Sequence, residues 1–190
     1  MLHKKLILAS ASPRRKELME DIGYPFTVEC SEIEEVLQKD ISVEKAIEQI
    51  ALSKAQDVFQ KYPDAMVLGC DTVVCFGNEV LGKPKDKEDA YRMLKLLSGK
   101  THLVISAVAL LQEGHCDVFH DVSEVTFYDL DEELISYYLS LDEPYDKAGS
   151  YGIQGKGKLL VKELYGDYFS VMGLPVSKVY RLLKKYEKQY

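Results

Sequence analysis

Two arginines near the amino terminus, Arg14 and Arg15, stand where a helix is expected to begin. Residues 6–9 form a short apolar run typical of a buried strand, and Ser12 with the proline after it is typical of an N-cap and first helical residue. The helix dipole puts partial positive charge at this end, so cations are unfavourable there unless an anion is bound. Backbone N–H groups, the hydroxyls of Ser10 and Ser12 and the two guanidinium groups together suit a phosphate chain. Two solvated surface arginines are the alternative interpretation.

Lys54 lies in the middle of an apolar stripe on the next predicted helix, which begins after the N-cap Ser42 and runs to residue 62. At the ~100° per residue of an α-helix, the stripe is formed by Val43, Ile47, Ile50, Ala51 and Val58. An ammonium at the centre of such a face needs an anion, either a carboxylate or a ligand phosphate. In the alternative interpretation, the lysine stem extends along apolar surface and carries its charge to water.

A carboxylate interrupts residues 65–76, which are otherwise almost entirely apolar and typical of a central strand. Asp71 in such a run is costly unless it is paired, hydrogen-bonded or bound to a metal, and aspartate is a poor strand former. A Gly-Asn pair then fits a two-residue hairpin turn, whose simple register places Thr72 near Lys83 with Asp71 beside them. This predicts a cluster of carboxylate, hydroxyl and ammonium. An ordinary salt bridge between Asp71 and Lys83 at the end of the sheet is the alternative.

Adjacent carboxylates, Glu34 and Glu35, follow the second predicted strand, residues 26–30. Their spacing alone favours a solvated acidic loop. The alternative is that one of them helps to hold a divalent metal ion against a polyphosphate.

Residues 142–158 form a glycine-rich, loop-like stretch with one side chain of special interest, Gln154. Glycines let a backbone approach a ligand closely, although such loops are often only flexible connections. The amide of Gln154 carries a donor and an acceptor in one plane, so it could read the imide edge of a uracil or thymine ring.

The other segments predict helix and sheet without evident chemistry. We expect helices over 86–97, 131–141 and from 173 onward, strands over 101–112 and 116–128, and a hairpin-like pair over 159–171. The tyrosines of the segment 131–141 are expected in core and interface positions.

Length and net charge limit the kinds of fold and binding partner that we expect. The 190 residues suit a single α/β domain. Lysine and arginine number 24 against 31 aspartates and glutamates, and this formal charge of −7 disfavours broad binding of nucleic acid while leaving local basic clusters able to bind phosphates.

Cysteine usage and hydropathy indicate the compartment. The 4 cysteines contain no C-x-x-C pair, and the segment around Cys116 lacks the partner ligands of a zinc site. No apolar stretch approaches the ~20 residues that span a bilayer. We therefore expect a cytoplasmic protein with reduced thiols and no membrane partner.

Four motifs occur in order along nearly the whole chain: residues 10–15 (SASPRR), 69–74 (GCDTVV), 82–84 (GKP) and 146–155 (DKAGSYGIQG). Together they resemble the motif set of the Maf family. The resemblance implies a nucleoside triphosphate pyrophosphatase that splits the α–β phosphoanhydride with a divalent cation, Mg²⁺ or Mn²⁺. It also implies one domain over residues 1–190 with the α/β fold of inosine triphosphate pyrophosphatases, an elongated mixed β-sheet with flanking helices in two lobes around a cleft.

The resemblance also assigns roles to single residues. Arg14, Thr72 and Gln154 match the dTTP/UTP-directed group of the family, and Asp71 matches its proposed proton acceptor. The other matches to active-site positions are Glu35 (or its neighbour Glu34), Lys54 and Lys83.

Residue chemistry and resemblance lead to one mechanistic hypothesis. Glu35 or Asp71 would hold the cation, and Asp71 would orient or deprotonate the attacking water. The groups expected to bind the triphosphate are Ser10, Ser12, Arg14, Arg15, Lys54 and Lys83.

A second class of function fits the same cationic cluster: a nucleotide-binding regulatory protein linked to cell division and septum formation. Sequence-specific DNA binding fits poorly, because the chain is acidic and has no helix-turn-helix signature. Relatives often form dimers, and the 13 tyrosines suit the interface of a homodimer.

Overall fold

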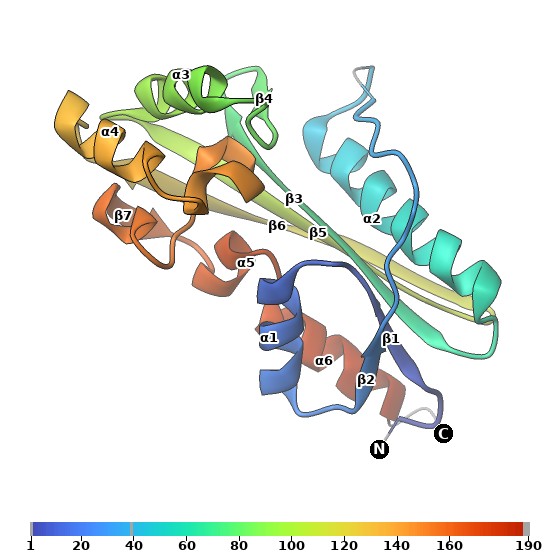
Figure 1. The fold of residues 1–190 in the computed structure, drawn as a ribbon. Helices are drawn as coiled ribbons and strands as arrows, with labels where there is room; N and C mark the ends of the chain where they lie inside the picture. Colours follow the sequence, from blue (N-terminus) through green and yellow to red (C-terminus); the bar gives the residue numbers. More distant parts are fainter. Residues whose placement is uncertain (1, 39, 188–190) are drawn as a thin grey trace. The chain divides into compact units, whose positions relative to one another are not determined.

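A mixed β-sheet flanked by helices forms the described part of the chain, residues 2–38 and 40–187 of the computed structural model (Figure 1). Among these residues the sheet has seven strands in the order β2-β1-β3-β5-β6-β7, with β4 paired to β3. The strands are β1 (Leu6–Ala9), β2 (Phe26–Val28), β3 (Met66–Phe76), β4 (Glu79–Leu81), β5 (Thr101–Gln112), β6 (His115–Phe127) and β7 (Val161–Tyr165). The α/β class and the mixed sheet confirm the sequence prediction.

Helices separate most of the strands along the chain, but β3 and β4, and β5 and β6, follow each other directly. The α-helices are α1 (Pro13–Ile22), α2 (Val43–Lys61), α3 (Lys87–Leu97), α4 (Glu132–Leu139), α5 (Tyr168–Met172) and α6 (Val176–Glu187). Three short 3₁₀ helices are η1 (Glu143–Asp146), η2 (Ala148–Ser150) and η3 (Gly157–Leu159). None of the helices within the described residues has the length and hydropathy needed to span a bilayer.

The chain divides into two compact units, and each is described by itself. Unit 1 contains the chain up to Asp71, Ser106–Asp121 and the chain from Gly173 onward, whereas unit 2 contains Thr72–Ile105 and Val122–Met172. The boundary in β3 falls between two neighbouring residues of one predicted motif.

In unit 1 the parallel strands β2, β1 and β3 lie side by side, and all four residues of β1 are buried. Helix α1 begins as predicted, because the Ser12 hydroxyl accepts a hydrogen bond from the Arg15 amide, and it ends at Gly23 in the left-handed conformation (φ +81°). Helix α6 lies beside α1 (Figure 1). The Lys178 ammonium contacts the Asp121 carboxylate and thereby ties α6 to β6.

Helix α2 packs closely on β3. It begins after the predicted N-cap Ser42, and its buried face contains Lys54 among apolar side chains. A Cβ atom added at Gly69 would lie 2.2 Å from the Ala51 carbonyl oxygen, so only glycine permits this approach of helix and strand.

In unit 2 the hairpin of β3 and β4 forms as predicted, with Phe76 opposite Glu79 across the turn. The core of unit 2 contains a cluster of three aromatic rings, those of His102, Phe127 and Tyr151. Their centroids lie 4.6–5.3 Å apart and their planes are nearly perpendicular. His102 is 2% exposed, and its Nε2 lies 2.7 Å from the Tyr151 hydroxyl. Burial lowers the pKa of His102 from 6.5 to about 4.

Because His102 is buried, we expect the stability of the protein to fall in acid. An imidazolium needs two hydrogen-bond acceptors, but Nδ1 of His102 has no partner in the structure. As pH falls, the unfolded chain takes up the proton first, so the free energy of unfolding should drop by about 3 kcal/mol between pH 7 and pH 4 through this group. Urea unfolding across that range measures the drop. His102→Gln should remove this part of the slope and the exposed His115→Gln should not; equal slopes in all three proteins would contradict the prediction.

Two sequence predictions need correction. The hairpin-like pair over 159–171 is wrong: β7 pairs with β6, and the chain after it forms α5. The second strand does not form for a local reason. The Asp167 carboxylate accepts a hydrogen bond from the Phe169 amide, and a helical turn begins there. The loop-like stretch 142–158 contains η1, η2 and the first residues of η3.

Candidate active site

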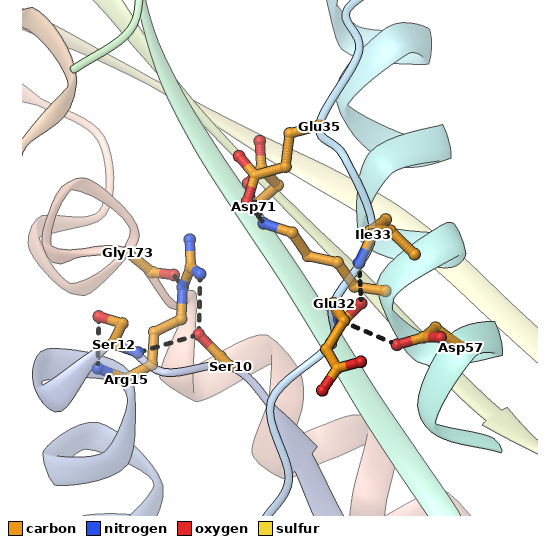
Figure 2. Close-up of polar contacts among 11 residues, drawn as sticks. Ser10, Ser12, Arg15, Glu32, Ile33, Glu35, Asp57, Asp71 and Gly173 are labelled. Carbon is orange, nitrogen blue, oxygen red and sulfur yellow. Dashed lines mark hydrogen bonds and ion pairs between the residues drawn. The ribbon is translucent and has the colours of Figure 1, made fainter. Parts of the chain in front are cut away.

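The Lys54 ammonium in unit 1 contacts two carboxylates. Its Nζ lies 2.6 Å from Asp71 Oδ1 and 2.7 Å from Glu35 Oε1 (Figure 2). Lys54 and Asp71 are 8% and 7% exposed, whereas the Glu35 side chain is 56% exposed. The apolar stripe predicted that Lys54 would meet an anion, and here a buried carboxylate and a surface carboxylate supply it.

The backbone positions this cluster from three segments. Asp71 is the last unit 1 residue of β3, and Lys54 lies on the face of α2 that packs against this strand. The close approach at Gly69 brings helix and strand near enough for a direct contact between the two side chains. Removing one partner of such a buried pair typically costs ~3–5 kcal/mol, because the other charge is left uncompensated.

Glu35 reaches the cluster from residues 29–38, which follow β2 and contain neither helix nor strand. The Glu32 amide in this segment donates to Asp57 Oδ2 at 3.1 Å (Figure 2). Donation by this amide, followed by a hydrogen bond from Ser31, lowers the pKa of Asp57 below its ordinary value, so the anchor is an ionised carboxylate. Because Asp57 follows Lys54 by three residues on α2, one helix face carries both the ammonium and the anchor of the loop. The simpler sequence interpretation, a solvated acidic loop, missed this contact.

A second polar cluster surrounds the first turn of α1 in unit 1. The Arg15 guanidinium donates from Nη1 to Ser10 Oγ at 3.1 Å and from Nε to the Gly173 carbonyl at 2.9 Å (Figure 2). Ser10 Oγ also accepts the Ser12 amide at 3.3 Å. Both acceptor sites of the Ser10 hydroxyl are then used, which leaves its O–H to donate outward. The first turn of α1 contains no acidic residue that would offset its positive end.

The two clusters act on the same part of β3. Burial raises the pKa of the Cys70 thiol to about 11, while the charges of Arg15 and Lys54 act in the opposite direction. Both cations therefore lie close enough to influence the residue next to Asp71. Arg14 is half-buried in the same first turn, and the structure leaves its predicted roles untested.

The remaining predicted residues belong to unit 2. Thr72 and Gln154 are half-buried and Lys83 is exposed. The hairpin register ends at Val74 opposite Leu81, so the predicted approach of Thr72 and Lys83 lies beyond the paired residues and stays a prediction.

The glycine-rich segment is joined to the hairpin of unit 2. The Gly149 amide donates to the Gly82 carbonyl at 3.1 Å, next to Lys83 in the chain. Gly149 has φ +68° and packs against β3, because an added Cβ would lie 2.9 Å from Val74 Cγ2. The Lys83 and Gln154 motifs therefore come from segments that contact each other within this unit.

Sequence reasoning missed two polar side chains that hydrogen-bond to the backbone before and after Gln154. The Glu143 carboxylate accepts hydrogen bonds from the backbone amides of Lys156 and Gly157. The Tyr138 hydroxyl donates a hydrogen bond to Glu143 and accepts one from the Gly152 amide. Glu143 lies in the stretch 142–158, which was predicted only as loop-like, and Tyr138 was expected among the core and interface tyrosines. No local pattern identifies either as a support of the loop.

The donor set of the first cluster fits Mg²⁺ or Mn²⁺. Mg²⁺ is usually held by one or two carboxylates together with substrate phosphates. The carboxylates of Glu35 and Asp71 converge on one point, occupied by the Lys54 ammonium. The described residues include no group of three or more His, Cys, Asp or Glu side chains that could hold a metal alone.

Comparison with known proteins gives one family and many relatives. A family model described as Maf-like protein matches residues 5–186. A dTTP/UTP pyrophosphatase of Bacillus velezensis is 49% identical over 183 residues, covering 96% of this chain and 97% of the relative. A dTTP/UTP pyrophosphatase of Bacillus cytotoxicus is 48% identical over 184 residues, covering 97% and 96% of the two chains.

Proposed function

Because this chain belongs to the Maf family, we propose that it is a nucleoside triphosphate pyrophosphatase that hydrolyses the α–β phosphoanhydride of dTTP and UTP. The products are the nucleoside monophosphate and pyrophosphate. The observation that supports this most directly is the buried contact between Lys54 and Asp71, with Glu35 beside it. A buried carboxylate held by an ammonium next to a cationic helix end suits hydrolysis of a polyphosphate.

The cations of unit 1 bind the triphosphate in this proposal. Arg15 is already oriented by Ser10 and Gly173, so little side-chain freedom is lost when a phosphate binds. Ser10 donates its O–H to a phosphate oxygen, and the N-terminal end of α1 adds the amides of its first turn. Arg14 and Ser12 take the further phosphate contacts assigned to their motif, and Lys83 of unit 2 takes the contact assigned to its own.

Asp71 orients and deprotonates the attacking water. Its Oδ1 accepts from Lys54, so Oδ2 is the oxygen that we assign to the water. The water oxygen forms the new bond to phosphorus, its proton passes to Asp71, and the bridging oxygen leaves with the pyrophosphate. Lys54 holds the carboxylate in place and lies where it also meets phosphate charge.

A divalent cation, Mg²⁺ or Mn²⁺, is the proposed cofactor, with Glu35 or Asp71 as its protein ligand. When bound, it neutralises the negative charge that develops on the leaving pyrophosphate. The loop anchor at Asp57 holds Glu35 near Asp71 for this purpose.

Base recognition is the role that we assign to unit 2. Gln154 pairs with the imide edge of uracil or thymine. Thr72 of the same unit and Arg14 of unit 1 complete the specificity set of the dTTP/UTP-directed group. We also place the protein in the cytoplasm, where thiols such as those of Cys30, Cys70 and Cys116 stay reduced. The homodimer expected from relatives stays a prediction.

Pyrophosphate release from a panel of nucleoside triphosphates tests the function and the pocket together. With Mg²⁺ present, kcat/KM should be highest for dTTP and UTP, and chelation should abolish release. Gln154→Ala should lower kcat/KM for these two nucleotides about 10–100-fold, the loss of one or two hydrogen bonds to the base, and should affect purine nucleotides far less. Gln60→Ala, an exposed position on α2, is the control and should leave the profile unchanged.

Other outcomes have distinct meanings. Preferential turnover of purine nucleotides would keep the phosphate chemistry and contradict the base assignment. Nucleotide binding without pyrophosphate release, with Mg²⁺ present, would instead support the nucleotide-binding regulatory protein.

A further inference from the structure

The Glu143 carboxylate in unit 2 is enclosed by the loop that carries Gln154. Its Oε2 accepts the Lys156 amide at 2.9 Å, and its Oε1 accepts the Gly157 amide at 3.0 Å. These two amides follow Gln154 by two and three residues. Charge-assisted hydrogen bonds to backbone amides are roughly twice as strong as neutral ones, so this carboxylate holds the end of the loop firmly.

Tyr138 connects the same carboxylate to the beginning of the loop. Its hydroxyl donates to Glu143 Oε1 at 3.1 Å and accepts the Gly152 amide at 3.1 Å. The side chain is 1% exposed, and burial raises the pKa of Tyr138, so the hydroxyl keeps its proton and donates. Both ends of residues 152–157 are thus fixed to one carboxylate, and Gln154 lies between them.

The glycines of this loop leave room for the carboxylate and for little else. Gly155 has φ +58°, and a Cβ added there would lie 2.5 Å from Glu143 Oε2. A Cβ at Gly157 would lie 2.0 Å from the Gly152 carbonyl oxygen and 2.8 Å from the Tyr138 hydroxyl. The backbone therefore lies directly against Glu143 at position 155 and against Gly152 and Tyr138 at position 157, which is why the loop needs glycine at both positions after Gln154.

Glu143 is ionised at neutral pH. Burial by itself raises the pKa of this carboxyl, but hydrogen bonds from the Lys156 and Gly157 amides, then from Tyr138, and the charge of Lys147 together bring it below its ordinary 4.5. The Lys147 ammonium also donates to the Glu143 carbonyl and to Asp146 Oδ1, both at 2.5 Å. The charged form that holds the loop is thus the stable one.

We propose that Glu143, acting with Tyr138, is a positioning residue that fixes the Gln154 loop for recognition of the pyrimidine base. The inference rests on the proposed function, because it assigns a role to a support of Gln154. The Glu143 carboxylate contacts the loop and the Tyr138 hydroxyl, so its effect is expected on base selectivity and not on the phosphate chemistry assigned to unit 1. A substitution of Glu143 should therefore change the ratio of kcat/KM between nucleotides that carry the same triphosphate but different bases.

Glu143→Gln is the test variant, because the amide keeps the size of the carboxylate but offers one acceptor oxygen to two backbone amides. The ratio of kcat/KM for UTP over CTP should fall about 10-fold through a higher KM for UTP, with kcat nearly unchanged. Tyr138→Phe removes the link to Gly152 and should lower the same ratio less. Glu132→Gln, a surface glutamate bonded to Tyr91 and Lys95, is the matched control and should leave the ratio unchanged.

Two further measurements separate positioning from general damage. In a double-mutant cycle, adding Glu143→Gln to Gln154→Ala should lower the UTP/CTP ratio no further, because the two residues act through one contact. Amide hydrogen exchange at Lys156 and Gly157 should accelerate in Glu143→Gln and stay unchanged in Glu132→Gln.

Each opposing result has its own meaning. An equal loss of kcat/KM for UTP and CTP, additivity with Gln154→Ala, or unchanged exchange of the two amides would overturn the positioning role while leaving the proposed function intact. If either variant fails to fold, the other carries the same comparison, and failure of both shows that the pair is required for folding and also overturns the role. A wild-type protein without preference for UTP over CTP overturns the base assignment and this inference together.

Discussion

Asp71→Asn is expected to lower kcat for dTTP and UTP about 100–10,000-fold while the nucleotide still binds. Asparagine has the shape of aspartate. Its carbonyl oxygen can still accept a hydrogen bond from the Lys54 ammonium, which lies 2.6 Å from Asp71 Oδ1. The variant loses only the negative charge and the ability to take a proton from water. Binding through Arg15 and the first turn of α1 does not depend on that proton.

Single-turnover pyrophosphate release measures the chemical step in this variant, and equilibrium binding of UTP measures affinity. Asp121→Asn is the matched control, because Asp121 is also a buried aspartate of unit 1 paired with a lysine, Lys178. It should reproduce any loss of stability without the loss of kcat. Near-normal turnover in Asp71→Asn would remove Asp71 from the chemistry, and lost binding would indicate that it mainly holds the cation.

Gly69→Ala is expected to destabilise the protein by about 3 kcal/mol or more and to abolish turnover in the fraction that folds. The new Cβ would lie 2.2 Å from the Ala51 carbonyl oxygen and 2.8 Å from the Ala55 amide. Both contacts are with the backbone of α2, which cannot move aside as a flexible side chain could. Helix and strand must separate, and Lys54 then moves away from Asp71.

Denaturant unfolding measures the loss of stability, and kcat at saturating UTP measures the loss of alignment. Gly82→Ala is the steric control, since a Cβ at Gly82 meets nothing within 4 Å and its φ is not positive. It should change stability by less than about 1 kcal/mol. A Gly69→Ala protein with wild-type stability would mean that the close packing of α2 on β3 is dispensable.

Local sequence signals predicted most of the elements. The helix starts at Ser12, Ser42 and Asp86 follow from side chains that accept a backbone amide of the first turn, an interaction within three residues. The hairpin between β3 and β4 follows from its two-residue turn. Where the prediction was wrong, at 159–171, a tertiary pairing of β7 with β6 and the turn at Asp167 decided the structure.

The candidate site was less accessible to sequence reasoning, because its contacts are not local. Lys54 was noticed through its place on an apolar stripe, yet nothing in that stripe identified Asp71, 17 residues away, as its partner. Glu35 approaches Lys54 because Asp57 holds the loop at Glu32, 25 residues earlier. The Arg15 guanidinium bonds to a carbonyl 158 residues later in the chain. Pairings over such separations are set by how whole elements pack, which one sequence does not reveal.

The boundary between Asp71 and Thr72 separates two sets of core contacts. The candidate hydrolytic residues Glu35, Lys54 and Asp71 lie in unit 1, whereas Thr72 and Gln154 lie in unit 2 with their supports. Under the proposed function, substitutions around Gln154 would alter core contacts of unit 2 and leave the contacts of Lys54 with Asp71 and Glu35 in place. The roles assigned to Arg14 in unit 1 and to Lys83 in unit 2 cross this division.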